Sequence, residues 1–262
     1  LVAGQEIVFH LAALIAIPHS YDAPHSYVDV NVTGTLNVLD AARTHGASRI
    51  VHTSTSEVYG TALTRPISED HPLHGQSPYS ASKIGADMMA EAYARSFGLP
   101  VSILRPFNTF GPRQSERAVL PTMIRQALDP ECETIRLGDL TPTRDFNYVT
   151  NTVSAFLDLG ENDAVEYGIP YNAGSGMEVS IGEVAERVRR LTGVNKPIEQ
   201  EVERMRPEHS EVRALIANSK RLTDATGWAA EIDLDEGLTH TINWWRERVQ
   251  DGKTRRGINY LR

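Results

Sequence analysis

The chain is poor in cysteine, in basic runs and in long apolar stretches. Its 262 residues include one cysteine, Cys132, so no disulfide can form within it, and a reducing compartment is expected. The net charge of -8 without a basic run argues against nucleic acid or an anionic membrane as a partner. No apolar stretch approaches the ~20 residues of a membrane-spanning helix, and no secretory signal pattern stands at the N-terminus. We therefore expect a cytoplasmic protein. Since its histidines show no metal-ligand spacing, we expect no metal site.

Short β-branched runs alternate with long helical patterns. The runs are Ile7–Leu11, Ile50–Thr53 and Val101–Leu104, and the helical patterns cover about 27–45 and 78–97. This alternation predicts an α/β fold with a parallel sheet and crossover helices. From Phe107 onward the pattern is mixed, which indicates a smaller second lobe.

Tyr79 and Lys83 are the first candidate for chemistry. Residues four apart on a helix share one face, and Ser77 with Pro78 marks the start of that helix. A lysine ammonium beside a phenol would lower the tyrosine pKa from ~10 towards neutrality, as alcohol–ketone proton transfer requires. Taken alone, the spacing is also that of an ordinary surface helix.

A hydroxyl-rich turn with a carboxylate follows the second run. It comprises Thr53, Ser54, Thr55, Ser56 and Glu57. Ligands of open parallel sheets sit at the carboxyl ends of strands, so this turn is a candidate site. The alternative is a turn whose hydroxyls cap their own backbone.

Together these motifs resemble the extended short-chain dehydrogenase/reductase superfamily, in its nucleotide-sugar epimerase and dehydratase branch. Further landmarks in the same order are His10-Leu11-Ala12-Ala13, Arg105–Arg113 and Arg144–Val149. The resemblance runs from about residue 7 to the helix near Trp245. It implies a Rossmann-like, doubly wound sheet formed by 1–107 and 149–177, with a mixed α/β substrate lobe formed by 108–148 and 178–250, and a loose tail at 251–262.

Members of this family open with a strand, a glycine-rich phosphate loop and a helix. The sequence has no G-x-x-G-x-x-G, and its first residues lead into what resembles the fourth strand of the sheet. Two βα units of roughly 30 residues each would restore the pattern. We therefore expect that the sequence is N-terminally truncated and that it binds cofactor weakly as it stands.

The resemblance also implies a cofactor site and a dimer. The cofactor is expected to be NAD, with NADP an alternative, because the discriminating residue cannot be read. The implied cofactor-binding residues are Leu11, Ala12, Ala13, Asn31, Thr53, Tyr79, Lys83 and Pro106. Family members pair through a four-helix bundle built from the two long helices, so a homodimer is expected.

The triplet Thr55-Ser56-Glu57 favours dehydration. The 4,6-dehydratases of the family carry Thr-Asp-Glu or Thr-Ser-Glu here, whereas the epimerases usually lack the glutamate. We expect Thr55, Ser56, Glu57, Tyr79 and Lys83 to be catalytic, in a nucleotide-sugar 4,6-dehydratase similar to those that act on N-acetylglucosamine nucleotides. The alternatives are a nucleotide-sugar 4-epimerase and a catalytically inactive sugar-nucleotide-binding protein or fragment.

The substrate diphosphate needs cations and hydrogen-bond donors. Guanidinium groups match phosphate geometry, so Arg144 and Arg206 are expected to bind it, and the resemblance adds Asn108 with Arg113 close by. Two alternatives stay open: Arg144 could pair with Asp145, and Arg204 could take the place of Arg206.

Overall fold

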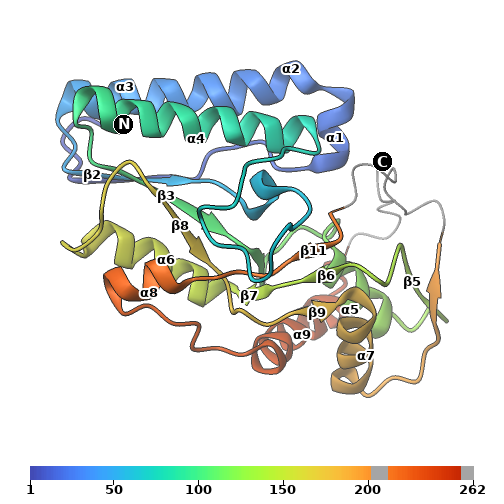
Figure 1. Cartoon of the computed structure of the whole chain (residues 1–262). Helices are drawn as coiled ribbons and strands as arrows, with labels where there is room; N and C mark the ends of the chain where they lie inside the picture. The colour runs from blue at the N-terminus through green and yellow to red at the C-terminus, as the bar shows by residue number, and fades with distance from the viewer. Residues whose placement is uncertain (202–211, 255–262) are drawn as a thin grey trace.

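The fold is an α/β arrangement around a parallel sheet. We describe it from a computed structural model, which covers residues 1–201 and 212–254 (Figure 1). Four strands pair in the order β1-β2-β3-β8, and every pairing is parallel. These strands are β1 (Ile7–His10), β2 (Arg49–Thr53), β3 (Val101–Pro106) and β8 (Pro170–Ala173). The predicted parallel sheet is confirmed.

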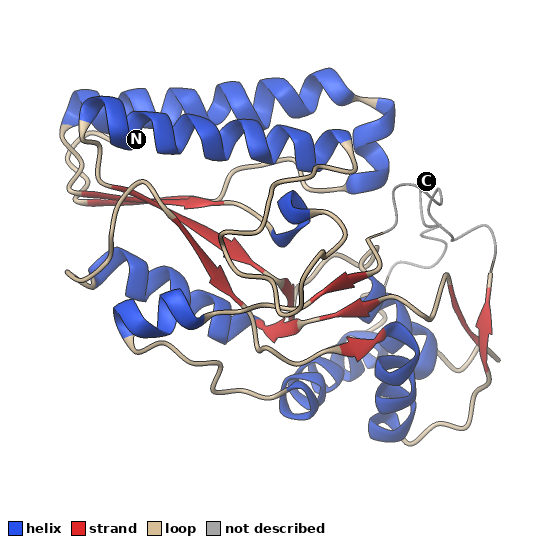
Figure 2. Cartoon of the chain, in the orientation of Figure 1, coloured by secondary structure: helices blue, strands red, loops and turns tan. Residues whose placement is uncertain are grey.

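Helices cover both faces of this sheet (Figure 2). One face carries α1 (Ile17–Asp22), α2 (Pro24–Tyr27), the π-helical segment η1 (Val28–Thr33), α3 (Gly34–His45) and α4 (Pro78–Phe97). The other face carries α6 (Val149–Glu161) and α8 (Lys220–Thr226). The first long helix is confirmed, although its opening turns are π-helical, a feature often found at functional sites. The helix ends at Gly46, which adopts a left-handed conformation with φ 67°.

The start of α4 is fixed by reciprocal capping. The Ser77 hydroxyl accepts from the Ser80 amide at 3.1 Å, and the Ser80 hydroxyl accepts from the Ser77 amide at 3.0 Å. Pro78 occupies the first turn, where no amide donor is needed. These contacts fix where α4 begins and therefore the face of the helix on which Tyr79 and Lys83 lie.

The remaining strands and helices form a mixed C-terminal region. Strand β4 (Asn108–Phe110) pairs with β7 (Phe146–Tyr148), and β5 (Ile135–Leu137) pairs with β10 (Ile198–Gln200). Strand β6 (Thr143–Arg144) lies between β9 (Val179–Ser180) and β11 (Ala214–Leu215). The helices are α5 (Val119–Leu128), α7 (Ile181–Thr192) and α9 (Leu234–Gln250).

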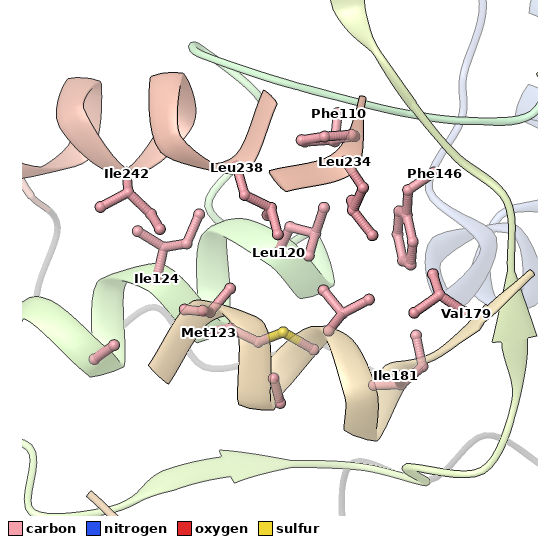
Figure 3. Packing of buried hydrophobic residues seen from close by; sticks show 14 of the residues in the cluster. Phe110, Leu120, Met123, Ile124, Phe146, Val179, Ile181, Leu234, Leu238 and Ile242 are labelled. Carbon is pink, nitrogen blue, oxygen red and sulfur yellow. The ribbon is translucent and has the colours of Figure 1, made fainter. Parts of the chain in front are cut away.

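The helices of this region pack on an apolar core (Figure 3). Leu120 and Ile124 of α5 meet Leu238 and Ile242 of α9. By contrast, Leu222 of α8 is buried with residues of the main sheet. The domain boundaries given above stay a prediction. In residues 1–201 and 212–254, no helix has the length and apolar character to cross a bilayer.

Candidate functional site

The predicted site residues converge on one edge of the sheet. In the parallel register His10 pairs with His52, and Thr53 pairs with Leu104, so β1, β2 and β3 end side by side. Leu11–Ala13 follow β1, the hydroxyl-rich turn follows β2, and Pro106 ends β3. The carboxyl ends of parallel strands form the ligand-binding edge of such sheets.

The turn after β2 is a short 3₁₀ helix, η2 (Ser56–Tyr59). The Thr55 hydroxyl accepts from the Glu57 amide at 3.2 Å and so caps η2. Gly60 ends it with φ 64°, where a side chain would collide with the His74 carbonyl. Thr55 therefore caps its own backbone, as the alternative interpretation expected. It also hydrogen-bonds the phenol of Tyr79, so capping does not exclude a place in the site.

The phenol of Tyr79 lies buried against this turn. Burial raises its pKa, the hydrogen bond from Thr55 opposes that rise, and the negative charge of Glu57 adds to it. The prediction that Lys83 lowers the tyrosine pKa is therefore wrong. Burial of the phenol dominates, and the Lys83 ammonium donates to the Thr53 carbonyl at 2.6 Å.

Lys83 is also buried, with 3% of its surface exposed. Burial lowers its pKa from 10.5 to about 8, and the negative charge of Asp87 partly offsets this. At neutral pH the amine is still mostly protonated, so a cation stands beside the hydroxyl-rich turn.

Sequence reasoning missed a buried charge network under the turn. Asp87, on α4, accepts from the Ser54 hydroxyl at 2.8 Å and from two Arg105 nitrogens at 3.0 and 3.1 Å. Arg105 also donates to the Tyr59 hydroxyl at 3.1 Å. One signal was available, because Asp87 follows Lys83 by four positions and shares its helical face.

Asn31 holds the loop after β1 in place. Its side-chain amide bonds the backbone N–H and C=O of Leu14 at 2.8 and 3.0 Å, and it donates to the Ser82 hydroxyl at 2.9 Å. The wider turn of η1 carries Asn31 into this fully buried position. Asn31 therefore shapes the predicted cofactor edge by linking that loop to α4.

This edge of the sheet has a polar group that is available to a ligand. The Thr53 hydroxyl is buried and has no hydrogen-bond partner within 1–201 and 212–254. Leu11 and Ala12 are exposed beside it at the end of β1. A hydroxyl, the Lys83 cation and an apolar rim fit the ribose and nicotinamide end of a dinucleotide.

The predicted substrate residues are only partly brought together. Asn108 begins β4, next to the end of β3, and its side-chain oxygen is buried with no hydrogen-bond partner in the described part of the chain. Arg113 lies farther along, with φ 68°, and lines a surface cavity of 450 Å³ with Trp244, Trp245 and Arg248. Arg206 and its alternative Arg204 lie outside the described residues.

Arg144 is buried in β6, and one of its guanidinium nitrogens donates to the Thr143 carbonyl at 2.9 Å. Asp145, its predicted alternative partner, is satisfied elsewhere. The Asp145 carboxylate accepts from the amides of Ser175, Gly176 and Ala217 and from the Ser175 hydroxyl. Among the residues described, no cluster of three or more His, Cys, Asp or Glu side chains could hold a metal ion.

Known proteins with similar sequences and structures modify nucleotide sugars. The sequence model of the family described as "GDP-mannose 4,6 dehydratase" matches residues 4–241. The UDP-glucose 4-epimerase of Mycolicibacterium smegmatis is 33% identical over 94% of this chain and 77% of its own length.

Two solved structures extend this similarity. RMD from Pseudomonas aeruginosa, complexed with NADPH, has a TM-score of 0.86 and 32% identity over 93% of this chain and 82% of that one. DesIV from Streptomyces venezuelae, a dTDP-glucose 4,6-dehydratase with NAD bound, has a TM-score of 0.85 and 27% identity over 95% of this chain and 76% of that one.

Proposed function

The chain belongs to the GDP-mannose 4,6-dehydratase family, and from that premise we propose that it is a nucleotide-sugar 4,6-dehydratase. The proposed reaction oxidises the sugar at C4, eliminates water across C5 and C6, and returns hydride to C6. The product would be a 4-keto-6-deoxy sugar nucleotide.

The observation that carries this proposal is the place of Glu57. Its amide is fixed by the Thr55 hydroxyl, and its carboxylate charge acts on the phenol of Tyr79. A 4-keto group acidifies the hydrogen at C5, and a carboxylate that acts on the phenol can remove this proton and transfer it to the C6 oxygen, which then leaves as water. Ser56, which is buried next to Glu57, would orient that carboxylate.

Tyr79 and Thr55 would handle the C4 oxygen. Tyr79 would take the hydroxyl proton, and the Thr55 hydroxyl would support the oxygen as its carbonyl develops. Because burial raises the pKa of Tyr79, the phenolate needs a nearby cation. Lys83 is the cation on the same helical face, and it would turn from the Thr53 carbonyl towards phenol and ribose.

We propose NAD as cofactor, with NADP as the alternative. Leu11, Ala12, Ala13, Thr53 and Lys83 would hold its ribose and nicotinamide end, with Pro106 at the end of β3 and Asn31 fixing the adjacent loop. When bound, the cofactor supplies a hydride acceptor and donor at C4 of its nicotinamide ring.

The proposed substrate is an N-acetylglucosamine nucleotide. Asn108 supports a polar substrate contact, because its buried side-chain oxygen has no hydrogen-bond partner among the residues that the structure covers. Arg144 and Arg206 are proposed to bind the diphosphate. Arg113 is a weaker candidate, since it lines a cavity with residues of α9.

A second candidate is a nucleotide-sugar 4-epimerase, which the similarity to the Mycolicibacterium enzyme favours. Glu57 separates the two functions. A dehydratase with Glu57→Gln would lose product formation and keep oxidation at C4, whereas an epimerase would keep both.

The proposal is tested by incubating the chain with UDP-N-acetylglucosamine, or its guanosine counterpart, and either dinucleotide. Mass spectrometry would show a product lighter by one water, with no net change in cofactor redox state. A product of unchanged mass that is a C4 stereoisomer by NMR would establish the epimerase. Cofactor binding without any conversion would support the inactive binding protein.

We also propose that the protein is a homodimer. Helices α3 and α4 lie side by side over the sheet (Figure 1), and large apolar side chains on η1 and α4 are exposed, among them Val28, Met88, Met89 and Phe97. A second copy could cover this surface as a four-helix bundle. Light scattering after size exclusion would give twice the mass of one chain for the wild-type protein, and Met88→Glu would lower the measured mass towards that of one chain.

The single cysteine supports a reducing compartment, which we propose is the cytoplasm.

A further inference from the structure

Asp87 is a fully buried carboxylate that the proposed chemistry does not use. One oxygen accepts three hydrogen bonds, from Ser54 at 2.8 Å and from two nitrogens of Arg105 at 3.0 and 3.1 Å. The other oxygen lies 3.3 Å from Nε2 of His52. A buried charge is tolerated when it is paired and hydrogen-bonded to this extent.

Through these contacts Asp87 is linked to Tyr79 and Lys83, the two predicted catalytic groups. Ser54 stands between Thr53, whose carbonyl holds the Lys83 ammonium, and Thr55, which hydrogen-bonds Tyr79. The Ser54 amide also donates to the Leu104 carbonyl at 2.7 Å, so the turn is tied to β3 from its other side. Asp87 follows Lys83 by one turn of α4 and acts on it electrostatically.

We propose that Asp87 is a positioning residue: with Ser54 and Arg105 it fixes the Thr53–Thr55 turn against α4, so that the Thr53 carbonyl holds the Lys83 ammonium and Thr55 lies against the phenol of Tyr79. The inference rests on the proposed function in so far as that function assigns the reaction to Tyr79 and Lys83. Asp87 touches neither group and acts through Ser54 and through its charge.

Several titratable groups face this carboxylate. His52 on β2 and Arg105 on β3 lie against it, Lys83 precedes it on α4, and Tyr59 lies behind Arg105. Although burial raises its pKa, His52 and Arg105 together hold the pKa of Asp87 below the ordinary value. His52 itself has its pKa lowered by burial and is neutral at pH 7. Asp87 thus carries a negative charge at neutral pH, and this charge favours the protonated form of Lys83.

The charge of Asp87 can be tested by NMR without substrate or cofactor. The chain has four lysines, so their side-chain signals can be assigned by Lys→Arg variants and titrated separately. In the unmodified protein we expect Lys83 to titrate near pH 8. Asp87→Asn keeps the shape but removes the charge, so the Lys83 titration should move to lower pH.

The chain offers a matched control. Lys220 and Asp224 have the same four-residue helical spacing, but both are exposed, and they are 2.6 Å apart. Asp224→Asn should leave the titration of Lys83 in place, because it removes an exposed carboxylate that forms its ion pair with Lys220. A Lys83 titration unchanged by Asp87→Asn would overturn the electrostatic part of the proposal.

The positioning role is tested by kinetics on the wild-type protein and two variants. We expect Asp87→Asn to lower kcat by about 10²-fold, the cost of a small misplacement of reacting groups, with KM nearly unchanged. Ser54→Ala removes one hydrogen bond and keeps the charge, so kcat should fall about 10-fold while the Lys83 titration stays in place. A thermal unfolding curve checks that each variant folds.

A wild-type kcat in folded Ser54→Ala and Asp87→Asn proteins would overturn the proposal. If Asp87→Asn does not fold, Ser54→Ala decides alone by the same criterion. If the wild-type protein converts no nucleotide sugar, the proposed function has failed, and the titration of Lys83 still tests the influence of Asp87.

Discussion

Two buried regions of the molecule differ in the chemistry of their side chains. The C-terminal core between α5, α7 and α9 is built mainly from apolar side chains, among them Leu120, Met123 and Leu238 (Figure 3). The interior under the hydroxyl-rich turn instead buries His52, Lys83, Asp87 and Arg105.

The two regions should therefore respond differently to substitutions. The stability of an apolar core depends on how well its volume is filled, so substitutions that conserve volume cost little stability. The stability of a buried charge network depends on every charge having its partner, because a buried charge that loses its partner is still desolvated without compensation. The stability of the C-terminal region should therefore depend on filled volume, and that of the region under the turn on complete pairing of its charges.

Arg105→Met should give the largest effect on stability. It leaves Asp87 buried without its guanidinium, and breaking a buried pair on one side costs ~3–5 kcal/mol. Urea denaturation would measure this loss of unfolding free energy. The double variant Asp87→Leu with Arg105→Met should lose less than Arg105→Met alone. A larger loss in the double variant would contradict the view that pairing governs this region.

Leu238→Ala should be the next largest change. Leu238 is fully buried between α5 and α9, and truncating such a leucine costs ~2–5 kcal/mol through lost burial and the cavity that remains. Leu238→Met is the volume-conserving control and should cost under ~1.5 kcal/mol. Activity per folded molecule should stay unchanged in both variants. A loss of kcat there would mean that the two regions are coupled.

The titration of Lys83 should make stability depend on pH. Its pKa falls from 10.5 to about 8 on burial, so between these pH values the unfolded chain binds a proton that the native protein does not. Unfolding free energy should therefore rise with pH across that window, and the penalty should stay constant below pH 8. Lys83→Met should flatten the profile. Denaturation at several pH values measures the slope of unfolding free energy against pH. The same slope in Lys83→Met and in the wild-type protein would refute the burial of a protonatable amine.

Arg190→Gln should have the smallest effect. Arg190 and Asp235 form an exposed ion pair at 2.7 Å on the surface of the C-terminal region. Such pairs contribute under ~1 kcal/mol, because solvent and salt screen them. A larger loss in thermal unfolding would show that surface charge stabilises this region more than its apolar core suggests.

Local signals made much of the fold predictable. The start of α4 was predicted from Ser77 and Pro78, because capping depends on residues within a few positions. The strands were read from their β-branched runs. The place of Thr55, Tyr79 and Lys83 at one sheet edge follows from these elements.

The network under the turn was not predictable in the same way. Asp87 meets Ser54 and Arg105 across 33 and 18 positions, and Tyr59 meets Asn172 across 113. Sequence spacing gave the face on which Lys83 lies but not the direction of its side chain. Burial raises the pKa of Tyr79, and the Lys83 ammonium is directed to the Thr53 carbonyl instead of the phenol, so the expected lowering was wrong.

The most direct test of the central claim is to run the reaction in D₂O and locate deuterium in the product by NMR. In the proposed dehydration, Glu57 removes the C5 proton and solvent protons exchange before C5 is protonated again. The account predicts a product lighter by one water, with deuterium at C5, and no such product from Glu57→Gln. A C4 stereoisomer without deuterium at C5 would contradict it and identify an epimerase.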